Sequence, residues 1–373
     1  MPYRGLTWDH PRGYNALAAA AAAQTDIELI WDKQPLEGFE AHPIADLCAR
    51  YDLVVLDHPH VGEAVAADCL QPLEDHFGAE EIAALEAESI GPSLASYRYE
   101  GRHWALPLDA ATQVMARRPD LVPAAPTSWD EILVLSRRAP VALSLAGPHS
   151  MLSFQSIAAS LGARCGADNP ERFVSGTAGA QALDIMAALA ARSPAAVRPL
   201  NPIGILGHMA SEDDVALCPL IYGYVNYATP ADPAAKPLAF SDAPRARLGG
   251  PPGSTLGGTG IGISKRCDVT PELLAHLRWL MSDTAQRGFI PSHDGQPSRR
   301  AAWHDELVNA RWGNFYRDTA ATLEAAHVRP RHDRAIAFQT EGAALIRAAL
   351  LDRRPHAATL AALQDAYHRS RQP

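Results

Sequence analysis

The stretch Tyr51-Asp52-Leu53-Val54-Val55-Leu56-Asp57 decides the fold. Its four central residues are all apolar, and such a short unbroken run is typical of a strand buried on both faces of a parallel sheet. Similar apolar runs occur earlier at 5–8 and 27–31, and helical patterns at 14–24 and 43–51 separate the three runs. Because crossovers between parallel strands are right-handed, this β-α-β-α-β order predicts an open, doubly wound sheet with strand order 2-1-3.

Length and composition indicate a globular protein of two lobes. The chain has 373 residues, of which 47% are apolar and 20% charged, so a sizeable core is available and one compact domain is not expected. The net charge is -9 and no tract is rich in Lys or Arg, which argues against a nucleic-acid partner. No apolar run approaches the ~20 residues that a membrane span needs.

The cysteines and the first residues bear on compartment. The five cysteines are odd in number, lie far apart and form no C-x-x-C pair, so we expect buried thiols without a metal or redox role. The polar residues of 8–13 interrupt the start of the chain, which therefore does not read as a secretory signal. Either a leader has been removed or the protein is cytoplasmic. The cysteines are Cys48, Cys69, Cys165, Cys218 and Cys267.

Polar and aromatic residues follow the first and third predicted strands. In an open sheet of this order, ligands bind beyond the carboxyl ends of the strands where the winding reverses, between strands one and three. Imidazole and carboxylate groups there would also suit a transition metal, but the second half of the chain has no comparable cluster, so a site for an organic ligand is favoured. The candidates are Trp8, His10 and Arg12 after strand one, and Asp57, His58 and His60 after strand three.

A second unit begins after Asp109. New strands are predicted at 113–116, 141–145 and 215–221, and Ser150 lies at a helix start beyond the second of them. Tyrosine offers an apolar face together with a hydroxyl, which suits a polyol. The further candidates of this half are Asp109, Ser150, Tyr222, Tyr224 and Asn226.

Five segments together resemble a known family. The chain is similar over nearly its whole length to the family 1 extracellular solute-binding proteins, the receptors of carbohydrate-type ABC importers. No single motif carries this resemblance, which rests on the order and spacing of all five. The segments are residues 5–13, 51–57, 99–109, 257–264 and 338–342.

The resemblance implies an α/β protein with the two-lobed periplasmic-binding-protein type II fold. Each lobe would be a doubly wound, mainly parallel sheet, with extra helices at the C-terminus, and the lobes would close on the ligand. Gly258 and Thr259 would lie in a segment that returns to the first lobe, and Ser292 and Asp294 complete the candidate set. The expected lobes are 1–108 with 260–302, and 109–259 with 303–373, with crossings near 108–110, 258–261 and 300–305.

The implied function is binding without chemistry. The ligand would be a small polar molecule (a sugar, polyol or sugar acid), and the partners would be the permease subunits of an ABC importer. No cofactor and no metal are expected, the protein would be a monomer, and its location would be periplasmic.

Two candidates have alternative partners. Arg12 pairs either with Asp9 at the surface or with a ligand carboxylate, in which case the ligand is an acid. Asp109 either accepts hydrogen bonds from ligand hydroxyls or caps the crossover as a structural carboxylate.

An enzyme built on the same two-lobed fold is the alternative from another class. In that case His10, His58 or His60 would act as general base against Asp57 or Asp109, and the protein would be cytoplasmic. No Walker lysine, G-x-S-x-G elbow or H-E-x-x-H motif occurs, so nucleophilic and zinc-dependent hydrolysis have no support in the sequence.

Overall fold

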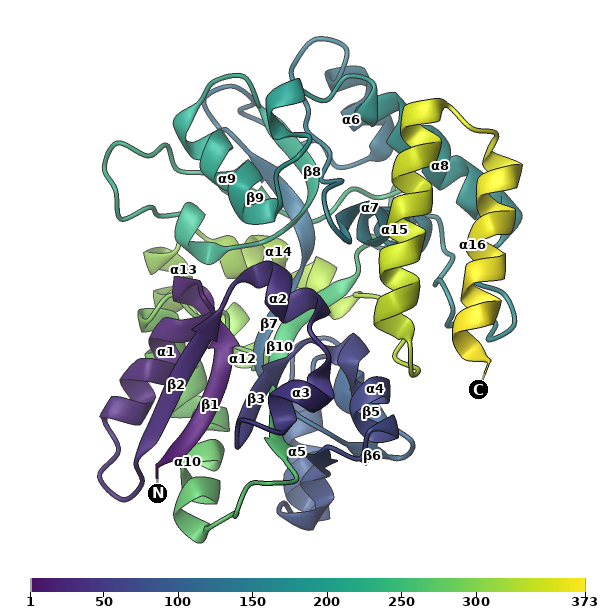
Figure 1. Cartoon of the computed structure of the whole chain (residues 1–373). Coiled ribbons are helices and arrows are strands. Elements are labelled where there is room, and N and C mark those ends of the chain that lie inside the picture. The colour runs from purple at the N-terminus through teal and green to yellow at the C-terminus, as the bar shows by residue number, and fades with distance from the viewer. Residues whose placement is uncertain (1, 373) are drawn as a thin grey trace. The chain divides into compact units, whose positions relative to one another are not determined.

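A computed structural model describes residues 2–372 of the chain, which form two compact units (Figure 1). Unit 1 comprises the chain up to Ala111, Gly257–Ala310 and Arg331–Ile336, and unit 2 comprises Thr112–Leu256, Arg311–Pro330 and the chain from Ala337. The lobe boundaries expected from the sequence concern which residues move together, and they stay a prediction.

The sheet of unit 1 contains the predicted parallel core. Strands β1 (Tyr3–Trp8), β2 (Leu29–Gln34) and β3 (Leu53–Leu56) run in the order β2-β1-β3, and both pairings are parallel. Strand β10 (Leu256–Ser264) then pairs antiparallel with β3 and with the short β4 (Leu70–Gln71). The predicted strand order 2-1-3 is therefore confirmed, and the sheet that contains it is mixed.

The four apolar residues of β3 are explained by the two faces of this sheet. Leu53 and Val55 belong to one apolar cluster together with Ile261 of β10. Val54 and Leu56 belong to a second cluster, which includes Leu47. Because successive side chains of a strand point to opposite faces, a strand covered on both faces needs apolar residues at every position.

Helices cover unit 1, and two of them begin at the signals that the sequence contains. The imidazole of His10 caps α1 (Pro11–Ala22), and Thr270 caps α10 (Pro271–Met281), with proline at the first helical position of each. The other helices of this unit are shorter: α2 (Leu36–Ala41), α3 (Ile44–Cys48), α4 (Val61–Ala66), α5 (Ala79–Glu88), α11 (Ile290–Ser292), α12 (Arg300–Trp303) and α13 (Glu306–Arg311), whose last residue belongs to unit 2. A separate two-stranded sheet pairs β5 (Arg98–Tyr99) with β6 (Arg102–His103).

The strands of unit 2 differ from the expectation. Residues 113–116 do not begin a new strand, because they continue β7 (Leu106–Arg117), which starts in unit 1. Strands β8 (Leu217–Tyr222) and β9 (Ala239–Ser241) both pair antiparallel with β7, so the prediction of a mainly parallel second sheet is wrong. The α/β class is confirmed, and the central sheet is mixed.

The segment 141–145 is not a strand. Val141 makes one isolated bridge to Leu217, and the backbone beyond it has no ladder. Val141, Ala142 and Leu143 are nevertheless fully buried. A short buried apolar run satisfies the same pattern whether or not a neighbouring strand is present, and for this reason periodicity alone misled the prediction.

The helices of unit 2 surround one apolar core. Phe154, Phe173, Phe338 and Tyr367 stack or meet edge to face within it. The extra C-terminal helices occur as expected, and the last of them, α16, packs on α8 (Figure 1). The helices are α6 (Trp129–Leu135), α7 (His149–Ser160), α8 (Gly176–Ala190), α9 (Pro202–Ser211), α14 (Phe315–Glu324), α15 (Ala335–Asp352) and α16 (His356–Arg371). Between residues 2 and 372, no helix has the length and apolarity to cross a membrane.

Candidate functional site

Candidate residues from three strands of unit 1 lie at one edge of its sheet. Trp8 ends β1, and Asp57 follows β3, whose register pairs Leu6 with Val54. In β10, Gly260 lies opposite Leu56 at the end of β3, so the preceding Thr259 lies near that edge as well. The structure thus brings the two predicted loops to neighbouring strand ends.

Arg12 and Asp109 form a buried ion pair at this edge. The Arg12 Nε donates to Asp109 Oδ2 at 2.9 Å, and Nη2 of the same guanidinium donates to Oδ1. Both residues are almost fully buried, with 6% and 5% of their surface exposed. Such a two-pronged contact is the geometry that a guanidinium and a carboxylate make best.

This ion pair gives Arg12 and Asp109 a partner that the sequence did not suggest. Arg12 does not pair with Asp9, whose carboxylate instead contacts Lys33 Nζ at 2.7 Å. Asp109 is not a free acceptor, because both of its carboxylate oxygens bind Arg12. The charges of Arg12 and Asp109 therefore compensate each other inside unit 1.

The ring of Trp8 is covered and does not offer a stacking surface. Phe39 lies 5.3 Å from it between centroids, and a Cβ on Gly13 would lie 2.4 Å from the ring, so glycine is required at that position. The Arg12 guanidinium lies 5.9 Å from the ring centroid. Trp8 Nε1 is buried and has no hydrogen-bond partner among the described residues.

His10 is a capping residue with a neutral ring. Its Nδ1 accepts the backbone N–H of Arg12 at 3.1 Å, which caps α1. Burial, and next the nearby Arg12 charge, lowers the pKa of His10 to about 4. The imidazole is therefore uncharged near neutral pH.

Asp57, His58 and His60 are part of the local packing. The Asp57 carboxylate accepts the backbone N–H of His58 at 2.9 Å and caps the short 3-10 helix His58–His60. His60 Nδ1 lies 3.6 Å from Glu63, and this interaction is the main cause that lowers the pKa of the Glu63 carboxyl. Among the described residues, no three His, Cys, Asp or Glu side chains are arranged to hold a metal ion.

The returning strand contributes Gly258 and Thr259. Gly258 has φ of +85°, and a Cβ there would lie 2.3 Å from the carbonyl oxygen of Asp109, so only glycine fits. Thr259 is 4% exposed, and its Oγ1 has no partner within residues 2–372.

Ser292 is the last residue of α11, and Asp294 lies two positions after it. The Ser292 hydroxyl donates to the carbonyl oxygen of Phe289 at 2.7 Å, and Asp294 accepts from Asn15 Nδ2 at 2.8 Å. Asp294 thereby ties this turn to α1.

The candidates of unit 2 are a serine whose hydroxyl joins two helices, two tyrosines and an asparagine. Ser150 is fully buried and donates to the carbonyl oxygen of Ala343 at 2.9 Å, so its hydroxyl joins α7 to α15. Tyr222 is partly buried, with its hydroxyl 3.2 Å from Thr255 Oγ1. Tyr224 is 4% exposed, and Asn226 Oδ1 is buried without a partner in the described part of the chain.

With this geometry established, comparisons with known proteins identify the family. Residues 16–299 match the model of the bacterial extracellular solute-binding protein family. This chain belongs to that family. A comparison with curated proteins found no sequence match.

Solved structures of similar fold cover the whole length of this solute-binding protein. An ABC transporter solute-binding protein from Agrobacterium radiobacter K84 in complex with ribitol has a TM-score of 0.78 at 21% identity, over 99% of this chain and 98% of that one. Maltose-bound MalE3 from T. maritima has a TM-score of 0.80 at 17% identity, over 98% and 99%. A solute-binding protein from Agrobacterium vitis S4 with bound D-mannitol has a TM-score of 0.72 at 15% identity, over 99% and 97%. At these identities the likeness shows the fold.

A neutral polar cluster in unit 2 of this solute-binding protein was not predicted. Gln113 Oε1 accepts from Ser156 Oγ at 2.7 Å, and Gln113 Nε2 donates to Ser153 Oγ at 3.3 Å. Ser156 Oγ also accepts the backbone N–H of Thr255 at 2.9 Å, and Ser254 Oγ donates to the Gln113 carbonyl at 2.6 Å. Ser153 and Ser156, three residues apart on α7, were the available signal, because such residues share one helix face.

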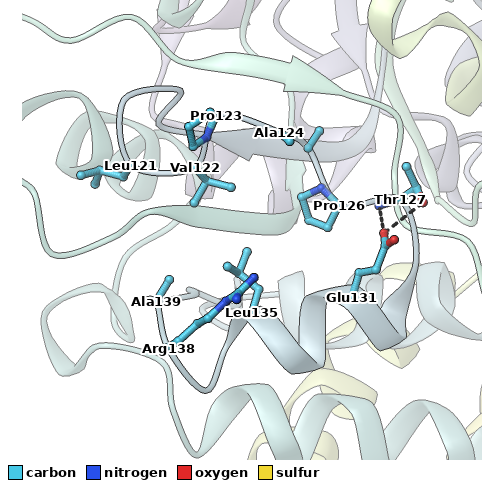
Figure 2. Close-up of a pocket in the computed structure, with 11 residues that line it drawn as sticks. Leu121, Val122, Pro123, Ala124, Pro126, Thr127, Glu131, Leu135, Arg138 and Ala139 are labelled. Atoms are coloured by element: carbon cyan, nitrogen blue, oxygen red, sulfur yellow. Dashed lines mark hydrogen bonds between the residues drawn. The ribbon is translucent and has the colours of Figure 1, made fainter.

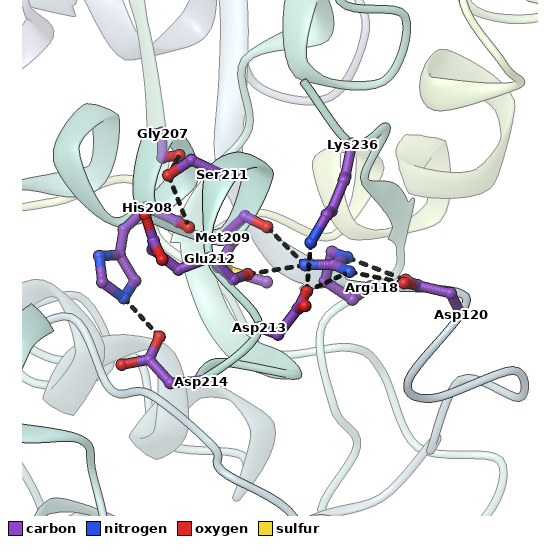
Figure 3. Close-up of polar contacts among 10 residues, drawn as sticks. All are labelled: Arg118, Asp120, Gly207, His208, Met209, Ser211, Glu212, Asp213, Asp214 and Lys236. Atoms are coloured by element: carbon purple, nitrogen blue, oxygen red, sulfur yellow. Dashed lines mark hydrogen bonds and ion pairs between the residues drawn. The ribbon is translucent and has the colours of Figure 1, made fainter. Parts of the chain in front are cut away.

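Arg118 forms a second polar centre that the sequence analysis missed (Figure 3). It is 1% exposed, and its Nη1 donates to the Glu212 carbonyl oxygen at 2.7 Å. Asp120 and Asp213 bind the same guanidinium, at 2.8 Å from Nε and Nη2 respectively. These bonds tie the end of β7 to the segment after α9, and the site has a structural role.

A surface pocket in unit 2 shares no residue with the candidate set (Figure 2). Its volume is about 590 Å³, and it lies between the loop 121–127 and α6. Glu131 at its rim accepts the Thr127 backbone N–H at 2.6 Å and completes the capping box of α6 with Ser128. The polar groups of this rim thus serve the helix start.

Proposed function

We propose that this chain is the binding receptor of an ABC importer and that its ligand is a neutral sugar or polyol. The observation that carries the choice of ligand is the Arg12–Asp109 pair. A sugar acid would need a cation for its carboxylate, and the guanidinium at this edge is already bound on both prongs by Asp109. Ribitol, maltose and D-mannitol, which the three structural neighbours carry, are all uncharged.

In unit 1, two buried polar groups without a hydrogen-bond partner among the described residues would contact the ligand. Trp8 Nε1 is a buried donor, and Thr259 Oγ1 is a buried hydroxyl that can donate or accept. An unpaired buried polar group costs about 1–3 kcal/mol, and a ligand hydroxyl that pairs with it recovers this free energy. The role of Arg12 and Asp109 is then to hold the ends of α1 and β7 in place rather than to bind charge.

In unit 2 the candidates are Tyr222, Tyr224 and Asn226. Asn226 Oδ1 is a buried acceptor without a partner among residues 2–372, and a sugar hydroxyl is a suitable donor for it. Ser150 is omitted from the proposed ligand set because its hydroxyl already donates to Ala343.

The receptor would not transform its ligand. A general base works best with a pKa near the working pH, and His10, with a pKa of about 4 and its Nδ1 occupied, is poorly suited. Asp109 is bound by Arg12, and Asp57 caps the helix that carries His58. Incubation with ribitol, D-mannitol or maltose should leave each compound unchanged by mass spectrometry, and turnover of any of them would favour the enzyme.

Ligand class is tested by calorimetry with a matched pair of compounds. D-mannitol and D-mannonate differ by one carboxylate, and we expect the neutral compound of each such pair to bind, with a dissociation constant near micromolar, about -8 kcal/mol. At ~100 times the dissociation constant, a ligand adds ~2.7 kcal/mol to stability, which a melting curve detects. Tighter binding of the acids than of the neutral compounds would overturn the proposal.

We also propose a periplasmic location and a monomeric state, with the permease subunits of the importer as partners. The family is extracellular, which gives no support to the cytoplasmic alternative. Light scattering on the purified protein should give the mass of one chain, and loss of the gene should abolish uptake of the ligand by intact cells.

A further inference from the structure

Two of the five cysteines are neighbours in the fold. Cys48 ends α3, and Cys69 immediately precedes β4. Both pack in the same apolar cluster of unit 1, beside Leu47 and Leu70. Each thiol shifts the pKa of the other, so the two side chains lie close together, and neither is in a disulfide in this structure. Spacing along the chain gave no hint of this contact.

One segment, Lys265 and Arg266, anchors the backbone near both cysteines. Cys69 donates its N–H to the Ala64 carbonyl at the end of α4 and accepts the N–H of Lys265 at 2.9 Å. The next residue, Arg266, donates to the Arg50 carbonyl at 2.6 Å, two residues after Cys48. Consecutive residues of one segment thus anchor the chain beside each cysteine, so the thiols can meet without a large backbone movement.

The two thiols are chemically unequal. The hydrogen bond with Cys69, and next burial, raises the pKa of the Cys48 thiol, whereas the same hydrogen bond lowers the pKa of Cys69. Cys69 is also the more exposed of the two, at intermediate burial against 4% exposure for Cys48. The thiolate is the nucleophile in thiol–disulfide exchange, so Cys69 is the side chain that reacts first.

The other three cysteines differ from this pair and provide internal controls. Burial raises the pKa of the Cys165 thiol and raises those of Cys218 and Cys267 to about 12. Buried, protonated thiols of this kind are unreactive.

We propose that Cys48 and Cys69 form an intramolecular disulfide when the protein meets an oxidising compartment, with an external disulfide as oxidant. The Cys69 thiolate attacks the external disulfide RS–SR, forming a mixed disulfide and releasing RS⁻. Cys48 then loses its proton and attacks the Cys69 sulfur, which releases the second RS⁻. Two protein thiols are oxidised by two electrons, one external disulfide is reduced, and the two protons pass to the RS⁻ groups or to water.

This inference rests on the extracellular character of the family and not on the ligand. Extracellular and periplasmic proteins meet oxidants, and disulfides persist there. The loop that the bond would close carries β3 and the 3-10 helix His58–His60. The disulfide would therefore fasten the strand and the loop that form part of the candidate edge.

The test is oxidation of the folded protein by oxidised glutathione. After reduction, removal of the reductant and oxidation, the denatured protein should show three free thiols in place of five. Its intact mass should fall by the two hydrogens lost, without a glutathione adduct, and peptide mapping should link Cys48 to Cys69. Melting temperature should be higher for the oxidised form, because a closed loop restricts the unfolded chain.

Two variants provide the matched comparison. Cys48→Ser removes the resolving thiol, so oxidised Cys48→Ser should keep a glutathione adduct on Cys69 or remain unreacted. Cys165→Ser should still form the linked peptide. The inference is overturned if the wild-type protein keeps five thiols, retains a stable adduct, or links any other pair. Ligand binding is measured separately, so failure of the proposed ligand class leaves the thiol count unchanged.

Discussion

The Arg12–Asp109 pair of unit 1 and the Gln113 cluster of unit 2 are buried polar groups of different kinds. Unit 1 buries an ion pair in which the carboxylate of Asp109 accepts two hydrogen bonds from the guanidinium of Arg12. Unit 2 buries a neutral cluster in which Gln113 and Ser156 make several weaker hydrogen bonds. Removing one partner of a buried ion pair leaves the other charge uncompensated, whereas removing one side chain of a neutral cluster removes only its own hydrogen bonds. A single substitution should therefore cost more stability in the ion pair than in the neutral cluster.

The largest effect should come from breaking the ion pair. Asp109→Leu removes the carboxylate that compensates the buried Arg12 charge, and breaking a buried ion pair in this way costs about 3–5 kcal/mol of the free energy of unfolding. Replacing both residues, as Arg12→Met with Asp109→Leu, should recover much of this loss, because a well-packed apolar pair is often as stable as an ion pair. Urea unfolding of the two variants and the wild type measures the difference.

The exposed pair next to this site is the control. Asp9→Asn removes a contact with Lys33 in which both side chains are largely open to solvent, so no measurable loss of stability is expected. A loss for Asp9→Asn as large as for Asp109→Leu, or no recovery in the double variant, would show that the burial of Arg12 does not set the cost.

The second effect is loss of a bond in the neutral cluster of unit 2. Ser156→Ala removes the partner of both the Thr255 N–H and Gln113 Oε1, and it should cost about 2–3 kcal/mol because buried polar groups are left unpaired. Ser211→Ala, at an exposed position, is the matched control and should be neutral. Equal melting temperatures of Ser156→Ala and Ser211→Ala would remove the neutral cluster as a source of stability.

Buried histidines should make stability depend on pH in one direction. Burial, with a smaller effect of Arg329, lowers the pKa of His149 to about 3, from an ordinary value of 6.5. The unfolded chain then binds a proton that the folded chain does not, so stability is constant above pH ~6.5 and falls as pH decreases toward 3. Between pH 7 and 5 this one residue accounts for about 2 kcal/mol.

His149→Phe tests that prediction. The imidazole meets Tyr222 edge to face with centroids 6.0 Å apart, and a phenyl ring can keep this contact. Between pH 7 and pH 5, the free energy of unfolding should fall by about 2 kcal/mol less in the variant than in the wild type. Urea unfolding at both pH values measures this difference. His42→Asn, on a side chain that is 41% exposed, should follow the wild type. Parallel losses in all three proteins would exclude His149 as the cause.

The sequence predicted the parallel part of unit 1 because its signals are local. The apolar run of β3 lies within the strand that it specifies, and the helical patterns lie between the strands that they separate. The direction of the strands in unit 2 depends on partners such as Gln113 and Tyr222, which are far apart in the chain. No local pattern distinguishes a parallel from an antiparallel partner for a buried apolar run.

The candidate residues were found more readily than their partners. The sequence placed Arg12 after the first strand and Asp109 at the crossover, but it offered Asp9 as a nearer partner for Arg12, and Asp109 lies 97 positions away. The contact of Cys48 with Cys69 was missed for the same reason, since a fold decides which distant side chains meet. Contacts of long sequence separation are the part of the site that needed the structure.

The smallest effect on stability is expected at Thr259, whose buried hydroxyl can be compared with the hydrogen-bonded hydroxyl of Ser156. Thr259 Oγ1 is as buried as Ser156 Oγ, but no partner for it occurs among the described residues, so Thr259→Val keeps the shape and removes no bond. The free energy of unfolding should change by less than about 1 kcal/mol, and an increase is allowed because the unpaired hydroxyl itself costs free energy. Affinity for a neutral ligand should fall by about 0.5–1.5 kcal/mol, the net value of one hydrogen bond, if this hydroxyl binds the ligand. Calorimetry with D-mannitol or ribitol and a melting curve on the same variant give both numbers. A stability loss as large as that of Ser156→Ala would mean that Thr259 is already paired within the folded protein, and unchanged affinity would remove it from the ligand site.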